Sequence, residues 1–249
     1  MKQQVDMKQV EMDGSGAMFD AIAERYDGLN RVISLGMDQS WRRRTVRALR
    51  LEAGQRVLDV ATGTADLAIM AARMHEGVDF VGVDPSPKMV AIGAEKIERA
   101  KLGGRVVLRL GDACALPAAT ASFDAAMMAF GIRNVVDRPR ALEELARVVR
   151  PGGRIAILEA SQASRGFLAP LARFHARVVV PRLASLFSSR EAYEYLETSI
   201  RAFPPPAAFR VMLENAGLLV ERTDSFTLGV VSLYVAISRG PIISRGPIE

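Results

Sequence analysis

From residue 55 onward, short apolar runs alternate along the chain with stretches of helical periodicity, and this alternation constrains the fold more than any other feature. The apolar runs at 55–61, 78–84, 105–112, 122–130 and 154–160 predict five strands. Apolar residues recur at helical spacing after the first, second and fourth of these runs. Strands that alternate with helices favour a parallel sheet covered by helices on its faces.

The last apolar stretch, 218–237, predicts two further strands that form an antiparallel pair at the sheet edge. We therefore expect an α/β, Rossmann-like fold with a seven-stranded, mostly parallel sheet and an antiparallel C-terminal edge strand. Helices are expected over residues 18–50, ahead of the first strand. A helical insertion is expected over 162–216, because a connection of that length is rarely a bare loop.

A chain of 249 residues suits one large domain, which we expect at 17–238, with flexible tails at 1–16 and 239–249. The sequence has no run of about 18 uncharged apolar residues, so no membrane span is predicted. Its polar start lacks the apolar centre of a secretion signal, so a cytoplasmic protein is expected.

The segment 41–50 carries five arginines, which contribute to a net charge of +5. At helical spacing Trp41, Val46 and Leu49 face inward while the arginines point outward. This pattern predicts either a solvated helix face or a contact through Arg42–Arg50 with an anionic membrane surface or an acidic partner. Nucleic acid is not expected as a partner, because no nucleic-acid-binding motif accompanies the arginines.

The few cysteines and histidines exclude some kinds of site. Cys114 is the single cysteine, and the two histidines, His75 and His175, lie a hundred residues apart. An internal disulfide is therefore excluded, and neither a metal site nor a Cys–His nucleophile is expected.

The turn after the first strand lies where open α/β sheets bind ligands. A dinucleotide-binding turn reads G-x-G-x-x-G, but residues 57–68 (VLDVATGTADLA) place Ala61, Gly63 and Asp66 at those three positions. A carboxylate at the third position would repel a pyrophosphate and suits a positively charged ligand. S-adenosylmethionine meets this requirement, since it has an ammonium group, a sulfonium and no phosphate.

An adenosine needs two further polar groups, and the sequence has both. Asp84 ends the second strand, where an acid can accept hydrogen bonds from the two ribose hydroxyls. Asp112 follows the third strand, where it can meet the adenine amine. Each acid alone also suits a cap or turn, but their order on consecutive strands favours a nucleoside site.

These motifs resemble those of class I S-adenosylmethionine-dependent methyltransferases. The resemblance narrows to the ubiquinone/menaquinone C-methyltransferase family through MFDAIAERYDGLNRVISLGMDQSWRR, FGIRNVVDRPRALEEL, YEYLETSIRAFP and FTLGVVSLY, of which FGIRNV is the most specific. The chain departs from the family pattern at Ala129, at Ala160 and after Tyr234. Membership implies methylation of a ring carbon of a prenylated benzo- or naphtho-hydroquinone, with the insertion and the N-terminal helices covering a lipid-like acceptor.

Two alternatives remain open at this stage. The chain could methylate a phenolic or polyketide natural product, or it could be a non-catalytic binding protein with the same fold. The sequence also leaves open a homodimer and a peripheral contact with a membrane.

The resemblance assigns residues to two groups. It implies that Arg133 and Asn134 stabilise a phenolate and hold a water that takes its proton, and that Tyr26 closes over the methyl group or positions the acceptor. The alternatives are an ion pair of Arg133 with Asp137 or Glu144, and plain packing for Tyr26. The residues expected to contact the cofactor are Asp59, Gly63, Thr64, Asp66, Asp84, Pro85, Met89, Asp112, Ala113 and Ala129.

Overall fold

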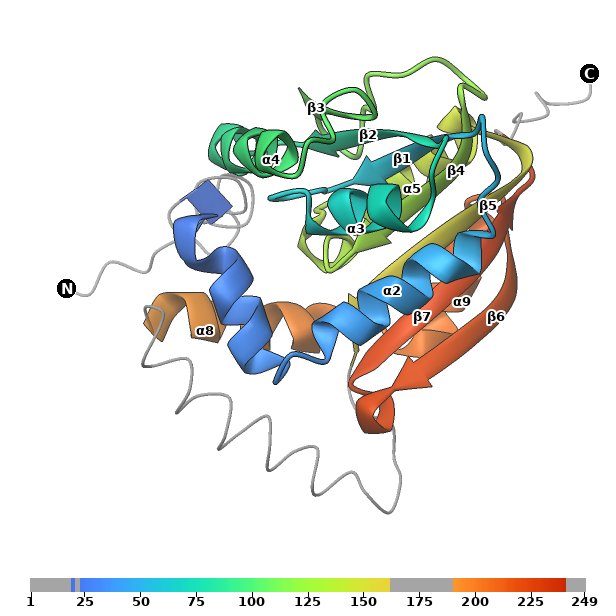
Figure 1. Cartoon of the computed structure of the whole chain (residues 1–249). Coiled ribbons are helices and arrows are strands. Elements are labelled where there is room, and N and C mark those ends of the chain that lie inside the picture. Colours follow the sequence, from blue (N-terminus) through green and yellow to red (C-terminus); the bar gives the residue numbers. More distant parts are fainter. Residues whose placement is uncertain (1–18, 21–22, 162–189, 241–249) are drawn as a thin grey trace, which may run out of the picture.

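The computed structural model describes residues 19–20, 23–161 and 190–240, and the sheet lies at its centre (Figure 1). The strands run in the order β3-β2-β1-β4-β5-β7-β6. Strands β1 to β5 are parallel to one another, whereas β7 is antiparallel to both β5 and β6. The seven strands have these bounds: β1 Arg56–Val60, β2 Asp79–Asp84, β3 Val106–Leu110, β4 Phe123–Ala129, β5 Val149–Ala160, β6 Leu218–Phe226 and β7 Val231–Ser238.

The helices cover both faces of this sheet, as Figure 1 shows. Their bounds are α2 Asp38–Leu49, α3 Asp66–Met74, α4 Pro87–Arg99, α5 Arg138–Val148, α8 Arg190–Ala202 and α9 Pro206–Asn215, with short 3-10 turns η1 Ile132–Asn134 and η3 Thr227–Gly229. One buried cluster joins the sheet to α2 and α3, and a second joins the opposite face to α5 and α9. These two cores fix the carboxyl ends of the parallel strands at one edge, where ligands bind in such sheets.

The predicted Rossmann-like fold is confirmed, with two corrections of detail. The antiparallel pair does lie at the sheet edge, but the C-terminal strand β7 is inserted between β5 and β6, so that β6 forms the edge. The fifth strand, predicted at 154–160, already begins at Val149, so the RPGG stretch at 150–153 lies within β5. There the pairing with β4 jumps from Val149 to Arg154, so the extra residues bulge out of the ladder.

The regions outside the parallel sheet contain helices, as expected, where the structure describes them. Residues 23–33 form a helix, called here the N-terminal helix, which precedes α2. Helices α8 and α9 lie in the second part of the predicted insertion, while its first part, 162–189, lies outside the described residues. His175 and most of both predicted tails also lie outside the described residues. In the described ranges, no helix has the length and apolar character that crossing a membrane requires.

The arginine-rich helix α2 differs from its prediction at one position. Trp41, Val46 and Leu49 are buried as expected, and Thr45 donates to the carbonyl of Trp41 at 3.0 Å. Arg42, however, is only 6% exposed. It lies on the buried face of the helix next to Trp41, where Asp38, four residues earlier, is 3.6 Å from its Nε. Its guanidinium also lies 5.4 Å from the ring centre of Phe130.

Candidate active site

The turn between β1 and α3 is built around Gly63. Its φ is +56°, and the flanking Ala61 and Ala65 also have positive φ, so the chain turns sharply at the end of β1. The Gly63 N–H donates to Asp84 Oδ2 at 2.8 Å, and the Ser86 N–H donates to Oδ1 at 3.0 Å. Burial raises the pKa of Asp84, although these two donors act in the opposite direction. Asp84 therefore joins the ends of β1 and β2.

Asp59 lies beneath this turn rather than at its surface. Its side chain is 1% exposed, and the Thr62 hydroxyl donates to Oδ2 at 2.7 Å. Burial raises the pKa of the Asp59 carboxyl to about 7, while the Thr62 hydroxyl and the charge of Arg42 lower it. Its structural contribution to a ligand site is therefore to hold the shape of the turn from below.

The third acid, Asp112, lies in the exposed loop after β3. It accepts a hydrogen bond from the Cys114 N–H at 2.8 Å and forms an isolated bridge with Ala115. The loop thus turns back at the strand end and places Ala113, which is buried, beside Asp112. The other predicted cofactor residues differ in exposure: Ala129 and Met89 are buried and Pro85 is exposed.

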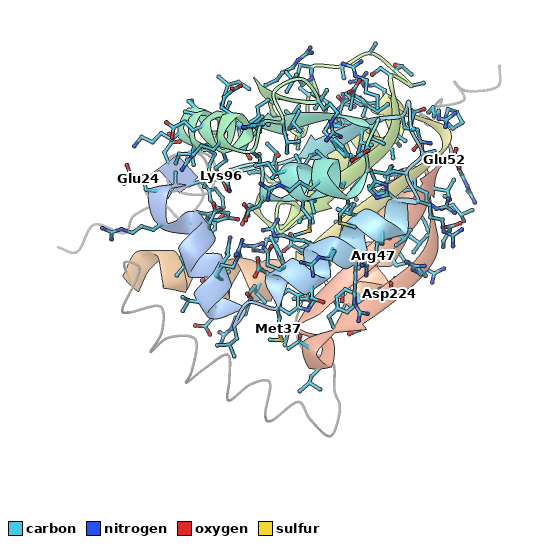
Figure 2. The ribbon with its side chains drawn as sticks, viewed as in Figure 1. Glu24, Met37, Arg47, Glu52, Lys96 and Asp224 are labelled. Atoms are coloured by element: carbon cyan, nitrogen blue, oxygen red, sulfur yellow. The ribbon has the colours of Figure 1, made fainter. Side chains whose placement is uncertain are left out.

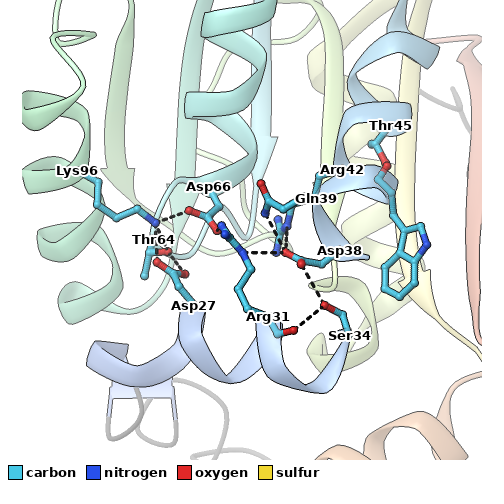
Figure 3. Close-up of polar contacts among 11 residues, drawn as sticks. Asp27, Arg31, Ser34, Asp38, Gln39, Arg42, Thr45, Thr64, Asp66 and Lys96 are labelled. Atoms are coloured by element: carbon cyan, nitrogen blue, oxygen red, sulfur yellow. Dashed lines mark hydrogen bonds and ion pairs between the residues drawn. The ribbon is translucent and has the colours of Figure 1, made fainter. Parts of the chain in front are cut away.

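Asp66 was predicted to select a positively charged ligand, but the chain already supplies positive partners for it. Its Oδ1 bonds to Lys96 of α4, and Oδ2 lies 3.6 Å from Arg31 of the N-terminal helix (Figure 3). Burial raises its pKa, but Lys96, Arg42 and Arg31 together outweigh burial, so the pKa lies below its ordinary value. The Asp66 carboxylate does not by itself explain discrimination against a diphosphate, because its charge is compensated.

The same polar cluster ties the N-terminal helix to the sheet. Asp27 accepts from Thr64 Oγ1 at 2.6 Å and from Lys96 Nζ at 2.6 Å. Arg31 lies 3.6 Å from Asp38 as well as from Asp66 (Figure 3). The predicted residues Thr64 and Asp66 thus come together, but the residues that hold them, Asp27 and Lys96, are far apart in sequence and were not predicted.

Arg133 lies on η1, directly after β4, and is 8% exposed. Its Nη1 donates to Glu159 Oε1 and to the Phe130 carbonyl, each at 2.7 Å. Burial lowers its pKa, but Glu159, Tyr26 and Tyr195 together exceed that effect and the pKa is raised. Sequence reasoning considered Asp137 and Glu144 as ion-pair partners. Both are wrong: Asp137 caps α5, and Glu144 pairs with Arg140 and Arg147.

Two tyrosines from different helices lie near Arg133. Tyr26 and Tyr195 both interact electrostatically with its guanidinium. Tyr195 of α8 donates to Asn134 Oδ1 at 3.3 Å, and Asn134 Nδ2 donates to the Phe130 carbonyl at 3.3 Å. The structure therefore brings together all three predicted catalytic residues, and it adds Tyr195.

The residues missed from the sequence carried weak signals. Glu159 is an acid that follows a purely apolar run, and a buried acid of this kind needs a cationic partner. Tyr195 belongs to one of the family-like stretches, but nothing in its spacing places it beside Asn134.

The residues at this edge fit an adenosine. Asp84 and Asp112 present carboxylates at neighbouring strand ends, where they can accept from ribose hydroxyls and an adenine amine. Gly63 itself has no side chain, and a Cβ at this position would lie 3.9 Å from the Tyr26 ring. Gly131 lets the loop after β4 approach this turn closely, since a Cβ there would lie 2.6 Å from the Cβ of Ala61.

The strand order, with an acid at the end of β2 beside a sharp turn after β1, gives this chain the fold of S-adenosylmethionine-dependent methyltransferases. A solved methyltransferase of this kind from Aquifex aeolicus superposes with a TM-score of 0.57 at 20% identity, covering 79% of this chain and 89% of that one. Such a likeness supports the fold alone.

The comparisons of sequence define the family. This chain belongs to the ubiE/COQ5 methyltransferase family, whose profile matches residues 5–238. It is 44% identical over 217 residues to the ubiquinone/menaquinone biosynthesis C-methyltransferase UbiE of Syntrophotalea carbinolica, covering 87% of this chain and 91% of the relative. It is 43% identical over 219 residues to the demethylmenaquinone methyltransferase of Thermus thermophilus, covering 88% and 98%. The chain is accordingly a methyltransferase that uses S-adenosylmethionine.

Proposed function

We propose that this enzyme methylates a ring carbon of a prenylated benzo- or naphtho-hydroquinone. The observation that carries the proposal is the buried Arg133, which a carboxylate and a carbonyl hold at the end of β4, next to the predicted nucleoside site. The activities of two relatives, a ubiquinone/menaquinone biosynthesis C-methyltransferase at 44% identity and a demethylmenaquinone methyltransferase at 43% identity, agree with it.

The first group of residues holds the cofactor. We assign Asp84 to the ribose hydroxyls, Asp112 and Ala113 to the adenine, and Gly63 to the approach of the ligand to the turn. Thr64 and Asp66 are assigned to the methionine end. When bound, S-adenosylmethionine supplies a methyl group on a sulfonium, which needs only a well-oriented nucleophile.

The second group acts on the acceptor. A neutral phenol ring is a poor carbon nucleophile, and a phenol of the tyrosine type has a pKa of about 10. A donor beside the hydroxyl oxygen lowers the cost of ionisation, and one preorganised donor can contribute about 3 to 4 kcal/mol. Arg133 and Asn134 have this role and hold the water that takes the hydroxyl proton. Tyr26, whose ring lies over the Gly63 turn, excludes bulk water and positions the acceptor.

The test is methyl transfer from radiolabelled S-adenosylmethionine to a reduced, short-chain demethylquinol. We expect a C-methylated product, identified by mass spectrometry and NMR, from the unmodified enzyme. Arg133→Ala should lose about 100-fold or more in rate, by the magnitude of one oxyanion donor, while calorimetry still shows cofactor binding. Methylation of phenolic natural products with inert quinols would overturn the acceptor assignment. Failure to bind S-adenosylmethionine would instead favour a non-catalytic protein.

We also propose that α2 contacts anionic lipid, from which such an acceptor would be drawn. Arg43, Arg44, Arg47 and Arg50 are exposed, whereas the buried Arg42 is not available for this contact. Binding to vesicles that contain anionic lipid should weaken at high salt and when Arg43 and Arg47 are both replaced by Gln. Equal binding by this variant and the unmodified protein would refute the contact.

A further inference from the structure

We propose that Glu159 is a positioning residue that holds the Arg133 guanidinium in the orientation needed at the acceptor oxygen. This inference rests on the proposed function, because it assigns a role within the same reaction. Glu159 lies near the end of β5 and is 0% exposed. Its carboxylate therefore has no access to water and does not itself contact the acceptor.

The Glu159 carboxylate holds Arg133 by two hydrogen bonds. Oε1 accepts from Nη1 of the guanidinium at 2.7 Å, and Oε2 accepts from the backbone N–H of Arg133 at 3.1 Å. Oε1 also accepts from the N–H of Ala160 at 2.8 Å, which fixes the carboxylate relative to its own strand. The buried Glu159 carboxylate therefore connects β5 to both the backbone and the side chain of Arg133, in the 3-10 turn that follows β4.

These contacts do not use every N–H donor of the Arg133 guanidinium. Nη1 is used twice, by Glu159 and by the Phe130 carbonyl. Its buried Nε has no acceptor among the described residues. A buried N–H without a hydrogen-bond partner costs free energy. The guanidinium is therefore positioned to donate to an oxygen of a bound ligand, which the described residues do not supply.

The effect of Glu159 is directional as well as electrostatic. Arg133 and Glu159 together carry no net charge, so the pair does not simply add a positive charge to the site. Its contribution is to restrict the guanidinium to one orientation, through the charge-assisted bond from Nη1 to Glu159 together with the bond from Nη1 to the Phe130 carbonyl. A shift of about 1 Å in such a group can lower the rate about 100-fold.

The chain contains a matched control in Glu144. It is 2% exposed, pairs with Arg147 at 2.7 Å and accepts from the Leu116 N–H at 2.9 Å, so its environment resembles that of Glu159. It lies on α5 and fastens the loop after β3, away from Arg133. Loss of a buried acid at either place should lower the melting temperature, but only one of the two should affect alignment of Arg133.

The experiment compares Glu159→Gln, Glu159→Asp and Glu144→Gln with the unmodified enzyme, using a reduced short-chain demethylquinol as acceptor. We expect Glu159→Gln to lower kcat about 10- to 100-fold while KM and the calorimetric Kd for S-adenosylmethionine change less than about threefold. Glu159→Asp, which keeps the charge, should recover part of kcat. Glu144→Gln should melt at a lower temperature with an unchanged kcat at saturating S-adenosylmethionine.

A second readout does not depend on the acceptor. NMR of the arginine side-chain nitrogens should show slow rotation of the Arg133 guanidinium, assigned with Arg133→Lys, and fast rotation in Glu159→Gln. If the unmodified enzyme leaves the quinol unchanged but this NMR difference is seen, the proposed function fails and the positioning role stands. An Arg133 signal that is the same in Glu159→Gln, or equal kcat losses in Glu159→Gln and Glu144→Gln, would overturn the positioning role.

Discussion

The buried Asp59 predicts a specific dependence of stability on pH. Its pKa rises from an ordinary 3.8 to about 7 in the folded protein, chiefly through burial. The folded protein therefore keeps a proton that the unfolded chain releases between these values. Compared with the fold that carries an ionised Asp59, this bound proton stabilises the folded protein in full below pH 3.8. The stabilisation is lost as the pH rises through about 7.

The magnitude follows from the shift. A shift of about 3 units at about 1.4 kcal/mol per unit corresponds to about 4 kcal/mol above pH 7, and to about 2 kcal/mol at pH 5. Asp59→Asn removes the titration and can still accept from the Thr62 hydroxyl. We therefore expect the variant to gain about 2 kcal/mol of stability relative to the unmodified protein between pH 5 and pH 8.

Urea unfolding at pH 5, 6, 7 and 8 without cofactor measures this difference. Any constant effect of the substitution on hydrogen bonding or packing cancels, because only the change with pH is compared. Asp79→Asn, at the exposed start of β2, controls for loss of one carboxylate from the sheet. A free-energy difference between Asp59→Asn and the unmodified protein that stays constant over this range would refute the assignment of a proton to Asp59.

Three further outcomes are expected. Lys96→Met removes the cation shared by Asp27 and Asp66, and hydrogen exchange in residues 23–33 should speed up while that in α5 stays unchanged. Gly131→Ala forces the loop after β4 away from Ala61, so it should lower stability by about 1 to 3 kcal/mol and weaken cofactor binding, unlike Gly104→Ala, which meets no atom within 4 Å. Tyr195→Phe removes the donor to Asn134, and steady-state kinetics should show a loss of about fivefold in kcat/KM.

The central part of the sheet was predictable from the sequence because β1, β2, β4, β5 and β7 are largely buried and therefore appear as nearly continuous apolar runs. Asp84 and Asp112 were predictable for a related reason: the carboxyl ends of parallel strands meet at one edge, so position in sequence determines position in space. The order of β6 and β7 was not predictable, since both orders satisfy the same pattern.

The partners of the charged groups could not be predicted. Asp66 and Lys96 are 30 residues apart, and their ion pair depends on how α4 packs beside the first turn. Arg133 and Glu159 lie on loops and strands that become neighbours only when β4 pairs with β5. The contact of Arg42 shows the same limit: helical spacing places Arg42 on the same face as Val46 and Leu49, but its contact with the Phe130 ring depends on how α2 packs against the loop after β4.

The insertion of β7 between β5 and β6 has a consequence for synthesis on the ribosome. β6 is made before β7, yet it pairs only with β7. Until synthesis has passed Ser238, β6 has no place in the sheet and the edge of β5 from Arg154 to Ala160 stays open. A nascent chain that pauses between the two strands therefore presents unpaired strand edges to chaperones and to neighbouring nascent chains.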